Sequence, residues 1–189
     1  MRWVLARLRR GALVRPGRCE FGVAVLWALT GWWVGAGAQA SAWLVVLLGL
    51  GWLAVALTAT DVAHRRLPDA LTLPALPAVL LLLLPLGPET TLRAVWGAVA
   101  LVACHALVHL AVPSALGAGD VKLAGVVGAV LGGISWAALV IGPLLAALLT
   151  AAVGVIGLLS GRLGRSDQLP HGPAMLGAAW VLAVLATGA

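Results

Sequence analysis

The chain has very little charge for its size. Only 10% of its 189 residues are charged, whereas 62% are hydrophobic and the mean hydropathy is +1.10. Soluble domains are about one-quarter charged and need that share to cover a surface that faces water. Six acids and twelve bases cannot supply such a surface, so the composition excludes a soluble domain, a disordered tail and a nucleic-acid-binding module, despite a pI near 11.4. We therefore expect a lipid bilayer to surround the chain.

Cysteine is also scarce, and the N-terminus lacks an apolar run. Cys19 and Cys104 form no C-x-x-C pair, which excludes a zinc ribbon and a disulfide framework. The first twenty residues hold six arginines, and without an apolar run they do not make a secretory signal peptide. We predict a basic cytoplasmic arm over residues 1–20 and a transmembrane domain over residues 21–189.

Long uncharged stretches predict the helices of this domain, because about 20 apolar residues in a helix cross a bilayer core of about 30 Å. The stretches lie at residues 21–60, 70–88, 94–111, 123–161 and 172–189. The first and fourth are each twice as long as one span, with glycine-containing turns at 35–41 and 132–135, so each predicts two helices. The predicted fold class is all-α, a polytopic transmembrane bundle of about seven spans.

The bases predict the orientation of the bundle, since lysine and arginine accumulate in cytoplasmic loops. A cytoplasmic N-terminus and seven spans place eleven of the twelve bases on the cytoplasmic side and leave only Arg93 outside. Merging the fifth and sixth helices would move Arg162 and Arg165 to the far side. The net charge of +6 also favours contact with anionic lipid headgroups.

Two of the six acids fall at functionally suggestive places. Asp61 ends the second predicted helix and Asp120 begins the fifth, so both lie at the cytoplasmic membrane boundary and can meet there. An ionisable residue at the rim of a span is a functional hypothesis by default. A second interpretation stays open, in which each acid is hydrated by headgroups or pairs with a nearby base such as Arg65, Arg66 or Lys122.

Three sequence segments carry a family resemblance. Asp61 begins the run DVAHRRLPDALTLP, Asp120 ends the run GAGD and is followed by Val-Lys, and the run LPHGPAMLG begins at Leu169. In this order and spacing, from about Gly51 to the C-terminus, the chain resembles the type IV prepilin peptidases, which are membrane aspartyl proteases of the GxGD kind. His171 stands where that family usually has phenylalanine.

The resemblance implies an activity and a set of site residues. Asp61 and Asp120 would be the catalytic pair, with no metal and no cofactor. The resemblance further implies a substrate-binding or active-site loop set of Pro68, Gly117, Gly119, Lys122, His171, Gly172 and Pro173. The substrate would be a prepilin-like or preflagellin-like protein, cut at the cytoplasmic face of the inner (plasma) membrane. In bifunctional members of the family, two C-x-x-C pairs accompany methyltransferase activity, and this sequence has no C-x-x-C pair. We therefore expect the short, stand-alone peptidase form.

The chemistry follows from two carboxylates brought close together. Such a pair shares one proton and can activate a water molecule against a peptide carbonyl. Gly117 and Gly119 would let the backbone adopt a positive φ and approach the substrate closely. For Lys122 we favour a membrane anchor over an ion pair with Asp120.

Two other functions compete with the peptidase. His105 and His109 stand four residues apart on one helix face, a spacing that can bind a metal, and with the two aspartates they would form a metal-dependent peptidase or a divalent-ion carrier. The H-E-x-x-H motif of metalloproteases requires a glutamate between its two histidines, and no glutamate lies between His105 and His109. The third possibility is a non-enzymatic assembly subunit, whose glycine and alanine content would serve helix packing.

Overall fold

The structure is a computed structural model, and it describes residues 17–38, 41–64, 67–113, 116–162, 164 and 169–186. Residues 1–16 of the predicted basic arm lie outside the described residues. The last three residues of that arm, Arg18 to Glu20, already belong to the first described helix. Within the described ranges every regular element is helical, which confirms the predicted all-α class.

Seven α-helices follow one another in the described part of the chain. They are α2 (Arg18–Trp33), α3 (Ser41–His64), α4 (Asp69–Leu83), α5 (Pro88–Ala111), α6 (Ala118–Ile134), α7 (Trp136–Leu159) and α8 (Gly172–Ala186). A π-helical turn, Val34–Ala38, extends α2, and a 3-10 turn, Leu84–Leu86, extends α4. The predicted break at 132–135 is confirmed, whereas in the predicted break at 35–41 the residues up to Ala38 are π-helical and residues 39–40 lie outside the described ranges. At the confirmed break, Ser135 caps α7 by accepting a hydrogen bond from the backbone N–H of Ala138 at 3.0 Å.

Five of these helices are long and apolar enough to cross a membrane. The candidate spans are Arg18–Ala36, Trp43–Val62, Asp69–Leu86, Pro88–Ala111 and Trp136–Leu159. The other two described helices, α6 with 17 residues and α8 with 15 residues, are shorter. Length and composition therefore support five of the seven predicted spans.

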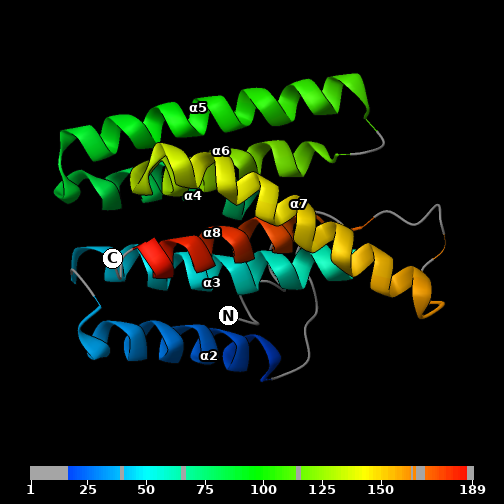
Figure 1. The fold of residues 1–189 in the computed structure, drawn as a ribbon, viewed down its shortest axis with the longest axis horizontal. Coiled ribbons are helices and arrows are strands. Elements are labelled where there is room, and N and C mark those ends of the chain that lie inside the picture. Colours follow the sequence, from blue (N-terminus) through cyan, green and yellow to red (C-terminus); the bar gives the residue numbers. More distant parts are fainter. Residues whose placement is uncertain are drawn as a thin grey trace.

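Helix α6 lies at the centre of the bundle. Figure 1 shows α2 beside α3 at one edge, α5 beside α6 towards the other edge, and α7 crossing the bundle obliquely. Residues 123–133 of α6 are all buried, whereas α7 exposes 60% of Leu144 and 67% of Leu148. A helix that is apolar on every side belongs in a core, and exposed leucines on a long helix suit contact with lipid.

Glycines bring α5 and α6 into backbone contact. A Cβ atom on Gly97 would overlap the carbonyl oxygen of Gly128, and a Cβ atom on Gly128 would overlap that of Gly97. One turn further along α6, a Cβ atom on Gly132 would lie 2.5 Å from the carbonyl oxygen of Arg93. Small residues at such positions let membrane helices gain van der Waals contact along their backbones. The glycine content of α6 is therefore explained by packing.

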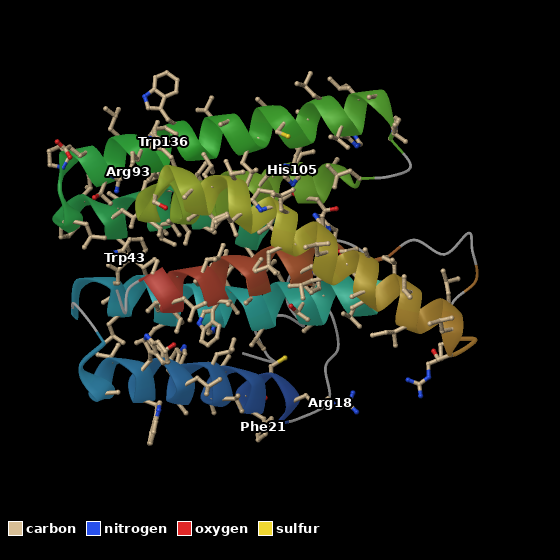
Figure 2. The ribbon with its side chains drawn as sticks, viewed as in Figure 1. Arg18, Phe21, Trp43, Arg93, His105 and Trp136 are labelled. Atoms are coloured by element: carbon tan, nitrogen blue, oxygen red, sulfur yellow. The ribbon has the colours of Figure 1, made fainter. Side chains whose placement is uncertain are left out.

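Arg93 caps the C-terminal end of α6. Its Nε donates to the carbonyl of Gly132 at 3.2 Å and its Nη2 to the carbonyl of Gly133 at 3.0 Å. The last carbonyls of a helix lack intrahelical donors and carry partial negative charge, so a guanidinium stabilises them. Figure 2 shows Arg93 at the same end of the bundle as Trp43 and Trp136. The one base that the sequence placed apart from the others thus has a structural partner.

Candidate functional site

Three helix ends meet at the other end of the bundle. The C-terminal end of α3 and the N-terminal ends of α6 and α8 lie there together (Figure 1). Asp61 lies in the last turn of α3 and is 6% exposed, and Asp120 lies in the first turn of α6. Gly119, the neighbour of Asp120, and Gly172, which lies against Asp61, both pack on Leu67, so the structure brings the two predicted acids to one place.

Gly172, the first residue of α8, closes one side of Asp61. A Cβ atom on Gly172 would lie only 3.0 Å from Oδ2 of Asp61, and the backbone amide of Gly172 faces the same carboxylate. Oδ2 itself is buried and has no hydrogen-bond partner among the described residues. A buried carboxylate oxygen without a donor is costly. The described residues therefore leave this oxygen without the donor that a buried carboxylate needs.

Leu67 packs against the residues that neighbour the two acids. A Cβ atom on Gly119 would lie 3.3 Å from the Cβ of Leu67, and a Cβ atom on Gly172 would lie 3.6 Å from its Cδ2. The Leu67 side chain, which is 6% exposed, thus packs between the residue before Asp120 and the residue beside Asp61. Leu67 could not be singled out from the sequence, since one leucine among many gives no signal of its own.

The glycines of the GAGD loop have ordinary backbone angles, and what distinguishes them is the absence of a side chain. Gly117 has φ −74°, and the described glycines with positive φ are Gly17, Gly87 and Gly161. The predicted positive φ at Gly117 and Gly119 is therefore wrong. The backbone N–H of Gly117 instead donates to Oδ2 of Asp120 at 3.3 Å, as in half of a capping box.

Lys122 pairs with an acid that the sequence analysis did not consider. Its Nζ lies 2.6 Å from Oδ1 of Asp69, and the two side chains are 40% and 43% exposed. The acid that Lys122 pairs with is thus Asp69 and not Asp120, so Lys122 bridges the starts of α6 and α4, while its role as a membrane anchor stays a prediction. Exposed ion pairs contribute little to stability. This ion pair nevertheless links the segment that carries Asp120 to the segment that follows Leu67.

Two prolines begin helices at the site. Pro68 has β-region angles as the N-cap residue of α4, and its carbonyl accepts hydrogen bonds from the backbone N–H groups of Leu71 at 2.9 Å and Thr72 at 3.1 Å. Pro173 is the second residue of α8, where a missing N–H costs no intrahelical bond. Both prolines therefore fix where the helices flanking the acids begin.

His171 makes a hydrogen bond that links α7 to α8. Its Nδ1 lies 2.8 Å from Oγ1 of Thr150, and its ring centroid lies 6.4 Å from that of His105. Burial lowers the pKa of His171, which favours the neutral imidazole. Thr150 was not singled out from the sequence, since a lone threonine in an apolar helix carries no pattern.

The two histidines of α5 serve different backbone partners. His105, which is 8% exposed and lies on the side of α5 that faces the other helices (Figure 2), bonds through Nδ1 to the carbonyl of Leu101 at 3.0 Å. His109 bonds through Nδ1 to the carbonyl of Leu116 at 2.7 Å. Among the residues that the structure describes, no group of three or more His, Cys, Asp or Glu side chains could hold a metal ion. The ligand set of both histidines with both aspartates is not assembled.

Comparison with known proteins gives a consistent set of matches. Residues 47–159 match the model of the "Type IV leader peptidase family". A "Prepilin leader peptidase/N-methyltransferase" of Pseudomonas putida is 34% identical over 174 residues, which cover 89% of this chain and 58% of the relative. A protein of the same name from Aeromonas salmonicida (strain A449) is 37% identical over 138 residues, 70% of this chain and 46% of the relative. The chain thus spans about half the length of these relatives, and no solved structure matches it.

Proposed function

Because the chain belongs to the type IV leader peptidase family, we propose that it is a membrane aspartic endopeptidase that removes the leader of a prepilin-like or preflagellin-like protein. The observation that supports this most directly is that Asp61, in the last turn of α3, and Asp120, in the first turn of α6, lie at the end of the bundle where Leu67 packs against both Gly119 and Gly172. The curated relatives carry the name of prepilin leader peptidases. No observation of equal weight favours an ion carrier or an assembly subunit.

The proposed mechanism needs only the two carboxylates and water. Two close carboxylates cannot both ionise readily, so they share one proton. One carboxylate takes a proton from water as the water oxygen bonds to the peptide carbon, while the protonated partner donates a hydrogen bond to the carbonyl oxygen. The C–N bond then breaks and the leaving amine takes up a proton from the pair.

We further propose that the bundle crosses the inner (plasma) membrane seven times with its N-terminus in the cytoplasm. Helices α6 and α8 would be about 26 Å and 23 Å long at about 1.5 Å per residue, less than the core of about 30 Å. Residues 123–133 of α6 and most residues of α8 before Val181 are buried or half-buried by neighbouring helices, so these two helices need not match the lipid core by length alone. This arrangement puts the acid-bearing end on the cytoplasmic side.

Accessibility labelling tests the orientation. Cys19 and Cys104 are first replaced by serine, and a single cysteine is then introduced in place of Arg162 or of Glu89. In sealed inverted and right-side-out vesicles, these two cysteines are expected to be labelled from opposite faces of the membrane. Arg162 follows α7 and Glu89 begins α5, and the proposed orientation places Arg162 in the cytoplasm. Labelling of both positions from one face would contradict the seven-span arrangement.

Cleavage by the purified full chain tests the proposed activity. In liposomes that also hold a candidate prepilin, we expect mass spectrometry to detect the released leader peptide. Excess EDTA should leave the rate unchanged, because the reaction proposed here uses carboxylates and water. Reversible loss of cleavage with EDTA would support a metal-dependent peptidase, and no cleavage of any prepilin by the folded chain would support a non-enzymatic subunit.

A further inference from the structure

We propose that Thr150 of α7 is a positioning residue for Asp61, acting through His171 and the backbone of Gly172. The inference rests on the proposed function for its kinetic readout, but the contacts that carry it are independent of any substrate. They form one path from α7 to the carboxylate. Thr150 bonds to His171, His171 precedes Gly172 in the chain, and Gly172 lies against Asp61.

The first contact has a defined direction. The hydroxyl of Thr150 has one hydrogen and donates it to the carbonyl of Ala146 at 2.9 Å. Its oxygen therefore accepts the hydrogen bond from Nδ1–H of His171, at 2.8 Å. The two bonds together hold the neutral imidazole in one tautomer and in one orientation. The Thr150 side chain needs both its hydroxyl hydrogen and its oxygen lone pair for this arrangement.

His171 controls where α8 begins. Its carbonyl accepts a hydrogen bond from the backbone N–H of Met175 at 3.1 Å, the first bond of that helix. The first N–H groups of a helix lack intrahelical acceptors and carry partial positive charge, which favours a carboxylate beside them. Asp61 lies at this end of α8, against Gly172. Any movement of the His171 backbone therefore moves these N–H groups relative to Asp61.

Helix α7 offers a second attachment for the same segment. A Cβ atom on Gly154, one turn beyond Thr150, would lie 2.7 Å from Cδ1 of Leu169. The segment before α8 is thus held against α7 at Leu169 by packing and at His171 by a hydrogen bond. Packing alone does not orient the imidazole, so removal of the hydroxyl should loosen the start of α8 without detaching it.

Three substitutions isolate the hydrogen bond. Thr150→Val keeps the shape of the side chain and removes the hydroxyl, Thr150→Ser keeps the hydroxyl, and His171→Phe removes the donor from the other side. The matched control is Thr30→Val in α2, where a buried threonine bonds only within its own helix, to the carbonyl of Leu26 at 2.8 Å. All four variants are made in the full chain, and size-exclusion chromatography and a thermal melt check that each is folded.

Steady-state cleavage of a prepilin gives the first readout. We expect Thr150→Val to lower kcat about tenfold with KM changed less than about twofold, because a small displacement of a reacting group affects the chemical step. Thr150→Ser should restore kcat to within about twofold, and Thr30→Val should match the unchanged chain. The double variant with His171→Phe should be no slower than the slower single variant, because both changes break the same path.

The second readout needs no substrate. Dicyclohexylcarbodiimide modifies protonated carboxyl groups, and mass spectrometry gives its rate at Asp61. We expect modification to be severalfold faster in Thr150→Val and normal in Thr150→Ser, because an N–H group facing a carboxylate favours its charged form. If no prepilin is cleaved but this pattern is found, the proposed function fails and the positioning role stands.

Two results would overturn the positioning role. One is unchanged kcat and unchanged Asp61 modification in folded Thr150→Val, and the other is additive losses in the double variant with His171→Phe. If Thr150→Val does not fold, His171→Phe decides alone: a fall in kcat with faster Asp61 modification supports the role, and an unchanged chain refutes it.

Discussion

Asparagine in place of either Asp61 or Asp120 is expected to abolish leader cleavage, with a fall in kcat/KM of about 10³-fold or more. Asparagine has nearly the shape of aspartate but cannot share or transfer a proton, so each variant leaves one carboxylate without its partner. Because the two acids act as one unit, the double variant should be no less active than either single variant. Leader release by the purified full chain, followed by mass spectrometry, measures all three.

The matched control for this pair is Glu89→Gln. Glu89 is an acid in the first turn of α5, at the end of the bundle away from the two aspartates, so its neutralisation should leave cleavage within about twofold. All variants should migrate as folded protein, which separates loss of chemistry from loss of structure. Full cleavage by folded Asp120→Asn would rule out a shared-proton mechanism at this site.

Valine in place of Gly128 is expected to destabilise the bundle strongly. The backbones of α5 and α6 touch at Gly97 and Gly128, and a Cβ atom at either position would overlap the other helix. Overpacking a tight core costs about 1–3 kcal/mol when side chains can adjust, and here backbone must move, so we expect about 3 kcal/mol or more. Unfolding followed by tryptophan fluorescence in increasing SDS measures the loss.

A valine at Gly177 of α8 serves as the control for this prediction. A Cβ atom there would meet no atom within 4 Å, so the same side chain enters a helix without a clash. Gly177→Val should change stability by less than about 1 kcal/mol, the range of intrinsic helix propensities. Equal stability of the two variants would show that α5 and α6 do not need their close approach.

The helices could be predicted from the sequence because the bilayer imposes their length and composition. The uncharged stretches and the glycine-containing turns predicted seven helices, which is the number of α-helices in the described part of the chain, and the break at Gly132–Ser135 is present there. The two acids could be singled out because so few acids are present, and the structure brings them together at one end. Their catalytic role stays a prediction, as does the orientation of the bundle in the membrane.

The contacts between distant side chains could not be predicted, since each depends on how whole helices pack. Lys122 and Asp120 stand two residues apart on one helix and do not face each other, but that Lys122 pairs with Asp69, 53 residues away, follows only from how α4 packs against α6. The GAGD glycines suggested unusual backbone angles, although the packing of Leu67 against Gly119 requires only the missing side chain. Thr150 and His171 are 21 residues apart, and neither has a periodicity that points to the other.

The cap that Arg93 places on α6 also has a consequence for the timing of membrane insertion. Its acceptors, Gly132 and Gly133, follow it by 39 and 40 residues. At synthesis rates of about 5–20 residues per second, these carbonyls leave the ribosome about 2 to 8 seconds after the arginine. Until then water or lipid headgroups must solvate the guanidinium, which keeps the start of α5 at the membrane surface. The arrival of α6 then releases Arg93 from the headgroups, so α5 and α6 are expected to settle into the bundle as one hairpin.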